Sequence, residues 1–232
     1  MLTFLRKIRK SIIESGSFSR YLVYALGEIA LVVIGILIAL QINNWNERKK
    51  DLNKEKEYLS GIANDLRADT AIIHIISDWL ERKSDEHMFV DSIYDNGLFQ
   101  TLSDRQIRMS MLLAFGQSFY PKTASYGSLI SSGMSNLIRN EELFGRIQNL
   151  YDVRYPRIVA MHHRGDELSN EISFKHIDKL RFGTSLEAIQ DRQFIADLWF
   201  LKRRAERYGR QFEQCELEVV SLIRGIEDEL AN

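Results

Sequence analysis

One stretch of this sequence, residues 21 to 46, is apolar on every side, and it divides the chain into unequal parts. Its apolar part holds one ionisable side chain, Glu28, apart from two tyrosine phenols. A helix of about 22 residues rises about 33 Å, enough to cross a hydrocarbon core of about 30 Å. Because Ile, Leu and Val occupy all its faces, lipid is the predicted surrounding. Tyr21 and Tyr24 at one end and Trp45 at the other are typical of membrane interfaces.

Two other interpretations of this stretch are open. A buried core helix of a soluble protein has a similar length and composition. A cleaved signal peptide is the closer alternative, because residues 29–40 alone have the length of a signal h-region. However, Ala39-Leu40-Gln41 lacks the small last residue that cleavage requires, and the apolar stretch begins upstream of Gly27. We therefore predict an uncleaved transmembrane anchor over residues 18–46.

One face of the predicted anchor carries small and polar side chains. Its members recur at spacings of four and three: Glu28, Val32, Gly35, Ala39 and Asn43. Gly35 and Ala39 form a small-xxx-small pair, which lets another helix approach closely. Glu28 is then either a polar latch in a helix–helix contact, with a second copy or another protein, or a side chain that reaches the lipid headgroups.

The apolar pattern continues beyond the anchor as a repeat of three and four residues. Its members are Leu52, Leu59, Ile62, Leu66, Ile73, Ile76 and Leu80, with Asp69 at one inward position. This spacing predicts a stalk helix over residues 47–95 with a narrow seam for a partner helix. Asn96-Gly97 is a turn signal that ends it. The partner helix lies either later in this chain or in another copy.

The C-terminal residues hold the same repeat over about four heptads. Its members are Leu198, Leu201, Ala205, Tyr208, Phe212, Cys215, Val219, Leu222 and Ile226. Because Cys215 lies within the seam, we predict an inert, buried thiol. Residues expected to be buried in the bundle are Leu66, Ile73, Ile76, Leu201, Tyr208, Phe212 and Leu222.

Capping and breaking signals place further helices between these two long ones. Ser103 or Asp104 can cap a helix that reaches about Phe115, and Gly133 ends a short helix that begins at residue 124. Asn140 caps a longer helix that Pro156 is expected to kink or break. Thr184 and Glu187 form a capping-box pattern. No alternating strand pattern occurs, so the predicted class is all-α, with residues 96–232 forming a helical bundle that packs with the stalk.

Composition argues against some classes of function and of site. The formal net charge of −1 argues against a general nucleic-acid binder. A single cysteine excludes an intrachain disulfide and a CxxC site. Residues 1–17 are basic and amphipathic, which favours contact with the headgroups of the bilayer.

The number of basic residues is equal on the two sides of the anchor, so this count does not decide its orientation. Five basic residues precede the span (Arg6, Lys7, Arg9, Lys10, Arg20) and five follow it closely (Arg48, Lys49, Lys50, Lys54, Lys56). The short basic leader favours a cytoplasmic N-terminus, and a long C-terminal domain can be translocated regardless of its charge. We expect a single-pass protein of the inner membrane with a periplasmic C-terminal domain.

No constellation of residues indicates catalysis, so no catalytic residue, cofactor or metal site is predicted. Phosphate loops, nucleophile elbows and His-Glu-x-x-His motifs are absent from the sequence. His163 with Asp166 or Glu167 has metal-ligand spacing on a helix, but no second such pair supports it. A connector containing Tyr120, Lys122, Tyr126 and Ser128 is the preferred place for a ligand or partner groove. A packed connector is the alternative.

The stretch GEIALVVIGILIALQINNWNE, preceded by FSRYLVYA, resembles the membrane helix of a family called domain of unknown function 6090, small single-pass proteins of Bacteroidota. A second segment, YGSLISSGMSNLIRNEELFGRIQNLYD, is similar to the family's region around a Ser-x-x-x-Ser-Gly turn. The resemblance implies an inner-membrane location and a mostly helical domain. It implies no activity and no site residues.

Three functions fit these observations. The first is a membrane-anchored interaction or scaffold protein with an envelope partner. The second is a sensory or ligand-binding module that signals through a partner, because only about 20 residues precede the span. The third, an enzyme, is disfavoured by the missing motifs. An exposed apolar patch on the bundle would favour the first function, and an internal pocket with convergent polar groups would favour the second.

Overall fold

The protein consists of helices and the segments that connect them. The computed structural model describes residues 18–99 and 107–231, and the chain divides into two units, Met1–Lys54 and Glu55–Asn232. No strand occurs in those two ranges, which confirms the predicted all-α class. The elements are α2 (Phe18–Asn96), α3 (Met109–Leu113), α4 (Ala124–Ser131), η3 (Ser135–Leu137), α5 (Glu141–Gln148), the π-helix η4 (Asn149–Arg154), α6 (Tyr155–Lys175), α7 (Ile177–Phe182), α8 (Ser185–Gln190) and α9 (Arg192–Ala231).

The first unit contains the N-terminal part of α2, and this part is a candidate membrane span. It includes an apolar stretch long enough to cross a bilayer, and none of that stretch is buried within the chain. A core helix would be covered by the rest of the chain, so that interpretation does not describe this protein. The predicted anchor and stalk are one unbroken helix, which ends at Asn96 before Gly97 with φ 64°. The predicted amphipathic segment 1–17 lies outside the described residues.

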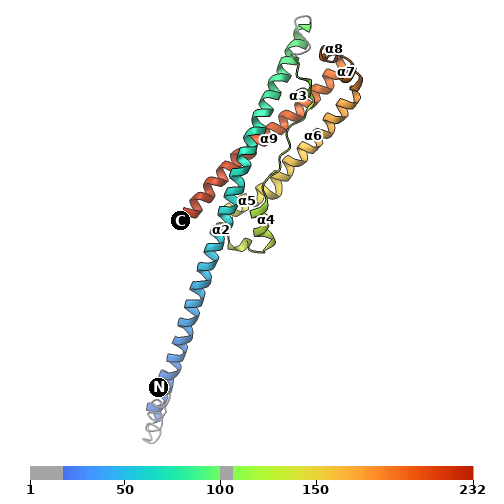
Figure 1. Ribbon diagram of the computed structural model, residues 1–232. Coiled ribbons are helices and arrows are strands. Elements are labelled where there is room, and N and C mark those ends of the chain that lie inside the picture. The colour runs from blue at the N-terminus through green and yellow to red at the C-terminus, as the bar shows by residue number, and fades with distance from the viewer. Residues whose placement is uncertain (1–17, 100–106, 232) are drawn as a thin grey trace. The chain divides into compact units, whose positions relative to one another are not determined.

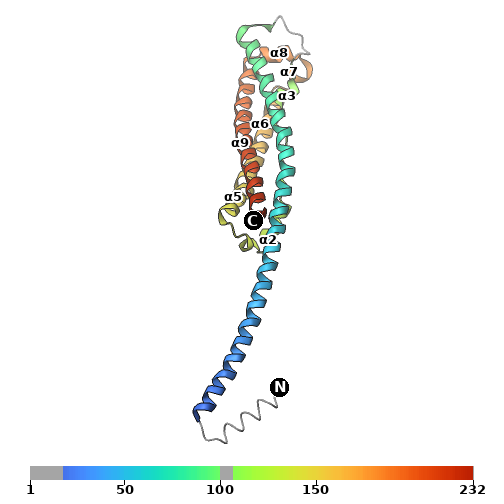
Figure 2. The same cartoon turned by 90° about the vertical axis from the view of Figure 1, so that its left-hand side faces the viewer.

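The second unit is built on three long helices: α2 from Glu55 onward, α6 and α9, which Figure 2 shows side by side. α9 runs antiparallel to α2, because Arg67 pairs with Glu227 at 2.6 Å and Asp91 pairs with Lys202 at 2.5 Å. All seven residues predicted to be buried are at most 1% exposed. The partner for the stalk seam therefore lies in the same chain.

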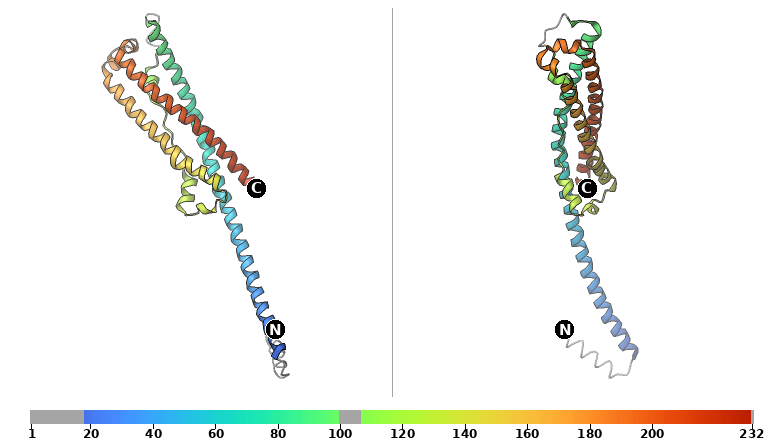
Figure 3. Two further views of the ribbon diagram at one scale, coloured as in Figure 1. Left: turned by 180° about the vertical axis from the view of Figure 1, so that it is seen from behind. Right: turned by 90° about the vertical axis from the view of Figure 1, so that its right-hand side faces the viewer.

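Residues 107–140 form a strap that runs back along α2, from α3 through an extended stretch to α4 and η3 (Figure 3). Four carboxylates of α2 accept backbone N–H groups of the strap in strictly reversed order. Glu86 binds Arg108, Asp69 binds Lys122, Asp65 binds Ser125 and Glu55 binds Arg139, at 2.7, 2.9, 3.0 and 2.8 Å. Such charge-assisted bonds satisfy backbone donors that have no helix partner.

The two outer bonds of this ladder are reinforced by guanidinium groups. Arg108 Nε lies 3.0 Å from Glu86 Oε2, and Arg139 Nε lies 2.8 Å from Glu55 Oε2. Both carboxylates are almost completely buried, while both arginines are more than half exposed. Each arginine therefore neutralises a buried charge from the solvent side and holds one end of the strap on α2.

The effect of Pro156 is a π-helical widening. The chain stays helical from Glu141 to Lys175, but η4 separates α5 from α6 immediately before the proline. Proline cannot donate the backbone bond of a regular helix, and its ring crowds the preceding turn. A π-helical turn accommodates both effects without ending the helix.

The predicted caps have different outcomes. Asn140 Oδ1 accepts the Leu143 N–H at 3.0 Å at the start of α5, and Thr184 forms the capping box of α8 with Glu187. Both predictions are confirmed. Ser103 and Asp104 lie outside the described residues, and the helix expected to reach Phe115 already ends at Leu113. It ends there because Ala114 turns to an extended conformation, with ψ 132°.

Gly165 is required by close packing. It lies in the middle of α6, and a Cβ at this position would be 2.1 Å from Cδ1 of the buried Phe115 ring. We expect Gly165→Ala to lower the free energy of unfolding by about 2 kcal/mol, because overpacking outweighs the roughly 1 kcal/mol that alanine contributes to helix propensity. Urea unfolding monitored by circular dichroism measures the change.

Gly145 of α5 provides the matched control. It is also helical, but a Cβ there meets no atom within 4 Å. Gly145→Ala is therefore expected to stabilise the protein by up to about 1 kcal/mol. Equal effects of the two substitutions would show that Phe115 does not lie against Gly165.

Candidate functional site

The predicted contact face of the anchor is uncovered within this chain. Glu28, Val32, Gly35, Ala39 and Asn43 are all exposed on α2, and a Cβ at Gly35 would meet nothing within 4 Å. Asn43 Nδ2 donates to Glu47 Oε1 at 3.0 Å, so this polar group is satisfied within the helix. The face is thus free for lipid or for another helix.

Of the four predicted groove residues, three are exposed and one is buried. The Tyr120 side chain is 75% exposed, whereas Tyr126 is buried and its hydroxyl donates to Asp152 Oδ2 at 2.8 Å. Lys122 contributes its backbone N–H to Asp69, and Ser128 lies exposed on α4. Tyr126 and the backbone of Lys122 thus have the contacts of a packed connector, while the side chains of Tyr120 and Ser128 are exposed.

Asp69 is the centre of a buried polar cluster beside the strap. The residue is completely buried, and its Oδ2 accepts the Tyr155 hydroxyl at 2.8 Å while Oδ1 accepts the Lys122 N–H. Burial raises the pKa of Asp69, and these two hydrogen bonds act in the opposite direction. Tyr151 packs edge-on against Tyr155 and stacks on Tyr126, with ring centroids 5.3 and 4.5 Å apart. The cluster joins α2, the strap and α6.

The histidines and the cysteine show no reactive arrangement. His163 Nε2 lies 3.3 Å from Glu167 on an exposed face, and His162 Nδ1 lies 3.2 Å from Asp166. Among residues 18–99 and 107–231, no group of three potential ligands could hold a metal ion. Cys215 is buried, as predicted, and burial raises the pKa of its thiol to about 12, so it stays protonated.

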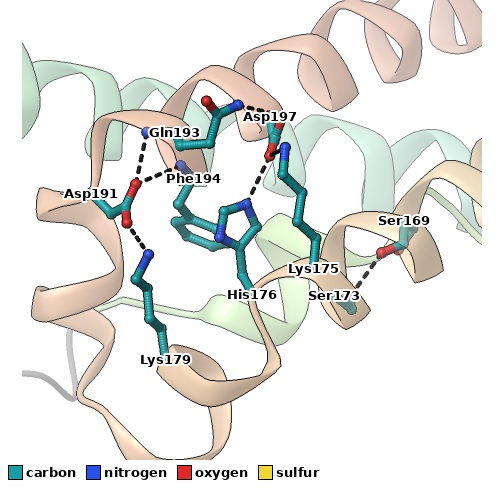
Figure 4. Close-up of polar contacts among 9 residues, drawn as sticks. All are labelled: Ser169, Ser173, Lys175, His176, Lys179, Asp191, Gln193, Phe194 and Asp197. Carbon is teal, nitrogen blue, oxygen red and sulfur yellow. Dashed lines mark hydrogen bonds and ion pairs between the residues drawn. The ribbon is translucent and has the colours of Figure 1, made fainter.

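Polar contacts connect the end of α6, α7, α8 and the start of α9 (residues 169–197, Figure 4). Asp197 Oδ2 contacts Lys175 Nζ and His176 Nε2, each at 2.7 Å. Burial would raise the pKa of Asp197, but the hydrogen bonds from His176 and Lys175 outweigh it, and the pKa is lowered. Asp191 pairs with Lys179 and also accepts the N–H groups of Gln193 and Phe194 at the start of α9.

Three exposed aromatic rings, each beside an arginine, lie at the end of α7 and near the start of α9; we call the three pairs the aromatic end. Arg181 lies over Phe182, Arg203 over Trp199 and Arg204 over Phe200, with 5.4, 5.1 and 5.2 Å from each guanidinium carbon to the ring centroid. The rings are 77%, 53% and 47% exposed, respectively. Trp199 and Phe200 are consecutive in α9, and large exposed aromatic side chains that lie together mark interaction surfaces more often than single exposed residues do.

The sequence contains a signal for the aromatic end at positions outside the buried three-four repeat. Trp199 and Phe200 stand between the seam residues Leu198 and Leu201, so the helical repeat itself places both rings off the seam.

The sequence of α2 also contains a signal for buried polar residues. The three-four repeat continues past Leu80 to Lys83 and His87, which places a cation and an imidazole at inward positions, and both are buried.

No curated protein and no solved structure matches this chain. The apolar helix, the helical unit that follows it and the absence of strands from the described ranges agree with the family resemblance of the sequence. Residues 28–202, most of the chain, match the sequence model of the family of unknown function DUF6090, and the protein belongs to that family.

Proposed function

We propose that this chain is a membrane-anchored interaction protein, without enzymatic activity of its own. In this proposal residues 18–46 hold the chain in the bilayer, and the aromatic end docks on an acidic surface of a partner protein. The observation that carries the proposal is the set of three exposed aromatic rings, each paired with an arginine, on α7 and α9 beside the ion pairs Lys175–Asp197 and Lys179–Asp191.

The chemistry of this surface fits a protein partner. Tryptophan and arginine are enriched among the residues that contribute most to binding at protein interfaces. Residues 199–210 contain five basic side chains and one acidic side chain. Of the five, only Lys202 forms an ion pair within the described residues. The four arginines are therefore free to meet carboxylates, and an acidic partner surface complements them.

The proposed location is the inner membrane, with the N-terminus in the cytoplasm and residues 55–232 in the periplasm. The exposed apolar part of α2 supports an anchor, since a soluble chain rarely leaves such a stretch uncovered. The short basic leader supports the orientation. The exposed face of Glu28, Gly35 and Ala39 supports a second contact, with the membrane helix of the partner or of another copy.

Loss of two aromatic anchors is expected to remove the partner. The full chain is tagged at its C-terminus and crosslinked in native membranes, then extracted in mild detergent to determine the mass and composition of the complex. We expect one stoichiometric partner, and Trp199→Ala/Phe200→Ala should reduce its capture at least tenfold, because truncating a hot-spot residue costs about 2 kcal/mol or more.

A matched control removes exposed apolar side chains elsewhere. Leu217 and Val153 are 68% and 53% exposed and lie away from the aromatic end. Leu217→Ala/Val153→Ala is expected to capture as much partner as the wild-type chain. Equal loss in both double variants, or full retention in Trp199→Ala/Phe200→Ala, would exclude the aromatic end as the docking surface.

A second function, ligand binding, is favoured by one specific observation. Between α2 and α9 lies a cavity of about 270 Å³ whose lining includes the buried residues Lys83 and His87. A helical module with such a cavity could couple a small ligand to partner binding.

A further inference from the structure

A second cavity, of about 290 Å³, lies between α9 on one side and η4 and α6 on the other. Ile158 and Cys215, which are buried, line its inner side, whereas Arg157 and Gln214 are exposed, so the cavity is open to solvent. Its volume lies just below the roughly 300–1,000 Å³ of sites for drug-sized ligands. The cavity is therefore accessible to a small soluble molecule.

Two arginines give this cavity a positive charge that no carboxylate compensates. Arg154 and Arg157 are three residues apart on one helical face, where like charges repel each other. Neither guanidinium forms an ion pair with a described residue, and none of the described residues that line the cavity is acidic. Glu218, one turn beyond Gln214 on α9, pairs with Arg146 at 3.1 Å instead. A bound anion would relieve this repulsion.

The polar groups of the lining have free donors. Arg154 Nε donates to Asn149 Oδ1 at 3.3 Å, and its two terminal nitrogens have no partner among the described residues. Gln211 Nε2 donates to Gln214 Oε1 at 3.1 Å, which leaves the Gln214 amide nitrogen free. The guanidinium of Arg157 donates to no group in the described part of the chain. The cavity thus offers two guanidinium groups and several amide groups to a ligand.

The π-helical turn η4 brings part of this lining together. Residues five apart in a regular α-helix are rotated by about 140° from each other, because each residue turns the helix by about 100°. A π-helix repeats at five residues, so Asn149 and Arg154 lie within hydrogen-bond distance. Single π-helical turns occur frequently at functional sites. The widening before Pro156 therefore also positions a guanidinium of the cavity.

We propose that this cavity binds a small phosphate monoester with a hydroxylated body, of the size of a sugar phosphate. A phosphate monoester carries close to two negative charges at neutral pH, which match the charges of Arg154 and Arg157. Guanidinium groups bind phosphate oxygens through paired, charge-assisted hydrogen bonds. The amides of Asn149, Gln211 and Gln214 can donate to hydroxyl groups and accept from them. A monocarboxylate would neutralise one arginine only, and inorganic phosphate would leave amide groups unused.

Isothermal titration calorimetry of the full chain, in a phosphate-free buffer and a detergent without phosphate groups, tests the proposal. The probe is glucose 6-phosphate, compared with inorganic phosphate, glucose and succinate at the same ionic strength. We expect glucose 6-phosphate to bind at least tenfold more tightly than each of the other three. Equal affinity for succinate would overturn the phosphate class, and equal affinity for inorganic phosphate would overturn the hydroxylated body.

Variants of the two arginines decide where the ester binds. Arg154→Gln and Arg157→Gln should each raise the Kd for glucose 6-phosphate at least tenfold, because each removes charge-assisted hydrogen bonds, and the double variant should abolish binding. Arg164→Gln is the matched control: this exposed arginine of α6 does not line the cavity, and its loss removes the same charge. It should bind glucose 6-phosphate as tightly as the wild type.

Two further measurements keep the result interpretable. Circular dichroism should show wild-type helical content in all variants, and the ³¹P resonance of glucose 6-phosphate should shift with the wild type and Arg164→Gln but not with the double variant. Wild-type affinity in the double variant, or equal loss in Arg164→Gln, would overturn the proposal. No residue of the aromatic end lines this cavity, and the titration uses the chain without its partner, so this test and the partner-capture test can fail independently.

Discussion

Replacing Asp69 by alanine is expected to destabilise the second unit by about 3–5 kcal/mol. The substitution leaves the Tyr155 hydroxyl and the Lys122 N–H without their acceptor, and each unpaired buried donor costs about 1–3 kcal/mol. It also detaches the middle of the strap from α2. Urea unfolding followed by circular dichroism and by tryptophan fluorescence gives the free energy of unfolding for the wild type and the variant.

Two milder substitutions separate hydrogen bonding from charge. In Asp69→Asn the amide oxygen can accept the Lys122 N–H and the amide nitrogen can donate to the Tyr155 oxygen. We therefore expect this variant to stay within about 1 kcal/mol of the wild type, because the lost charge was itself disfavoured by burial. Tyr155→Phe should cost about 1–2 kcal/mol. A large loss in Asp69→Asn would mean that the charge stabilises the cluster, contrary to this account.

The long helices could be predicted from the sequence because their burial repeats at helical spacing. Each residue of the C-terminal seam, from Leu198 to Ile226, is buried where the three-four repeat places it. Local capping also has local causes, so Asn140 and Thr184 could be recognised without knowledge of the tertiary structure. Periodicity and caps report on one helix at a time.

The strap could not be predicted from the sequence, because it has no local pattern of this kind. Its extended residues have no repeat, and their backbone partners are the carboxylates of Glu55, Asp65, Asp69 and Glu86, which lie 22 to 84 residues away in the sequence. A single acidic residue at an inward helix position looks like an exception to the pattern. Here four acidic residues of one helix accept backbone N–H groups of the strap, and together they hold it on α2.

Contacts between residues that are distant in the sequence also decide which of the singled-out residues are exposed and which are packed. Tyr120 and Tyr126 are neighbours in sequence, but one is exposed and the other is in the core. Gly165 lies within the regular helix α6, and the glycine makes room for Phe115 of the strap. In each case the deciding contact comes from the strap, whose path no local pattern specifies.

Stability between pH 7 and pH 9 is expected to depend on Lys83. Burial lowers the pKa of this lysine to about 7, from an ordinary value of 10.5. In this interval the folded chain releases the proton while the unfolded chain keeps it, so the unfolded state binds more protons and the free energy of unfolding rises with pH. We expect a rise on the order of 1–2 kcal/mol, because the three carbonyl bonds favour the ammonium and reduce the effect.

Lys83→Met should remove this rise, whereas Lys122→Met, at an exposed lysine, should keep it. The slope with pH is diagnostic, because the absolute stability of Lys83→Met combines two opposite effects, the loss of three hydrogen bonds and the relief of a buried charge.

Above pH 9 the buried thiol of Cys215, with its pKa raised to about 12, lowers the free energy of unfolding as pH rises, since only the unfolded chain then forms the thiolate. Urea unfolding at half-unit steps from pH 6 to pH 10 should therefore show a maximum near pH 9 in the wild type. A flat wild-type profile between pH 7 and pH 9 would mean that the three backbone carbonyl oxygens hold Lys83 fully protonated despite its burial.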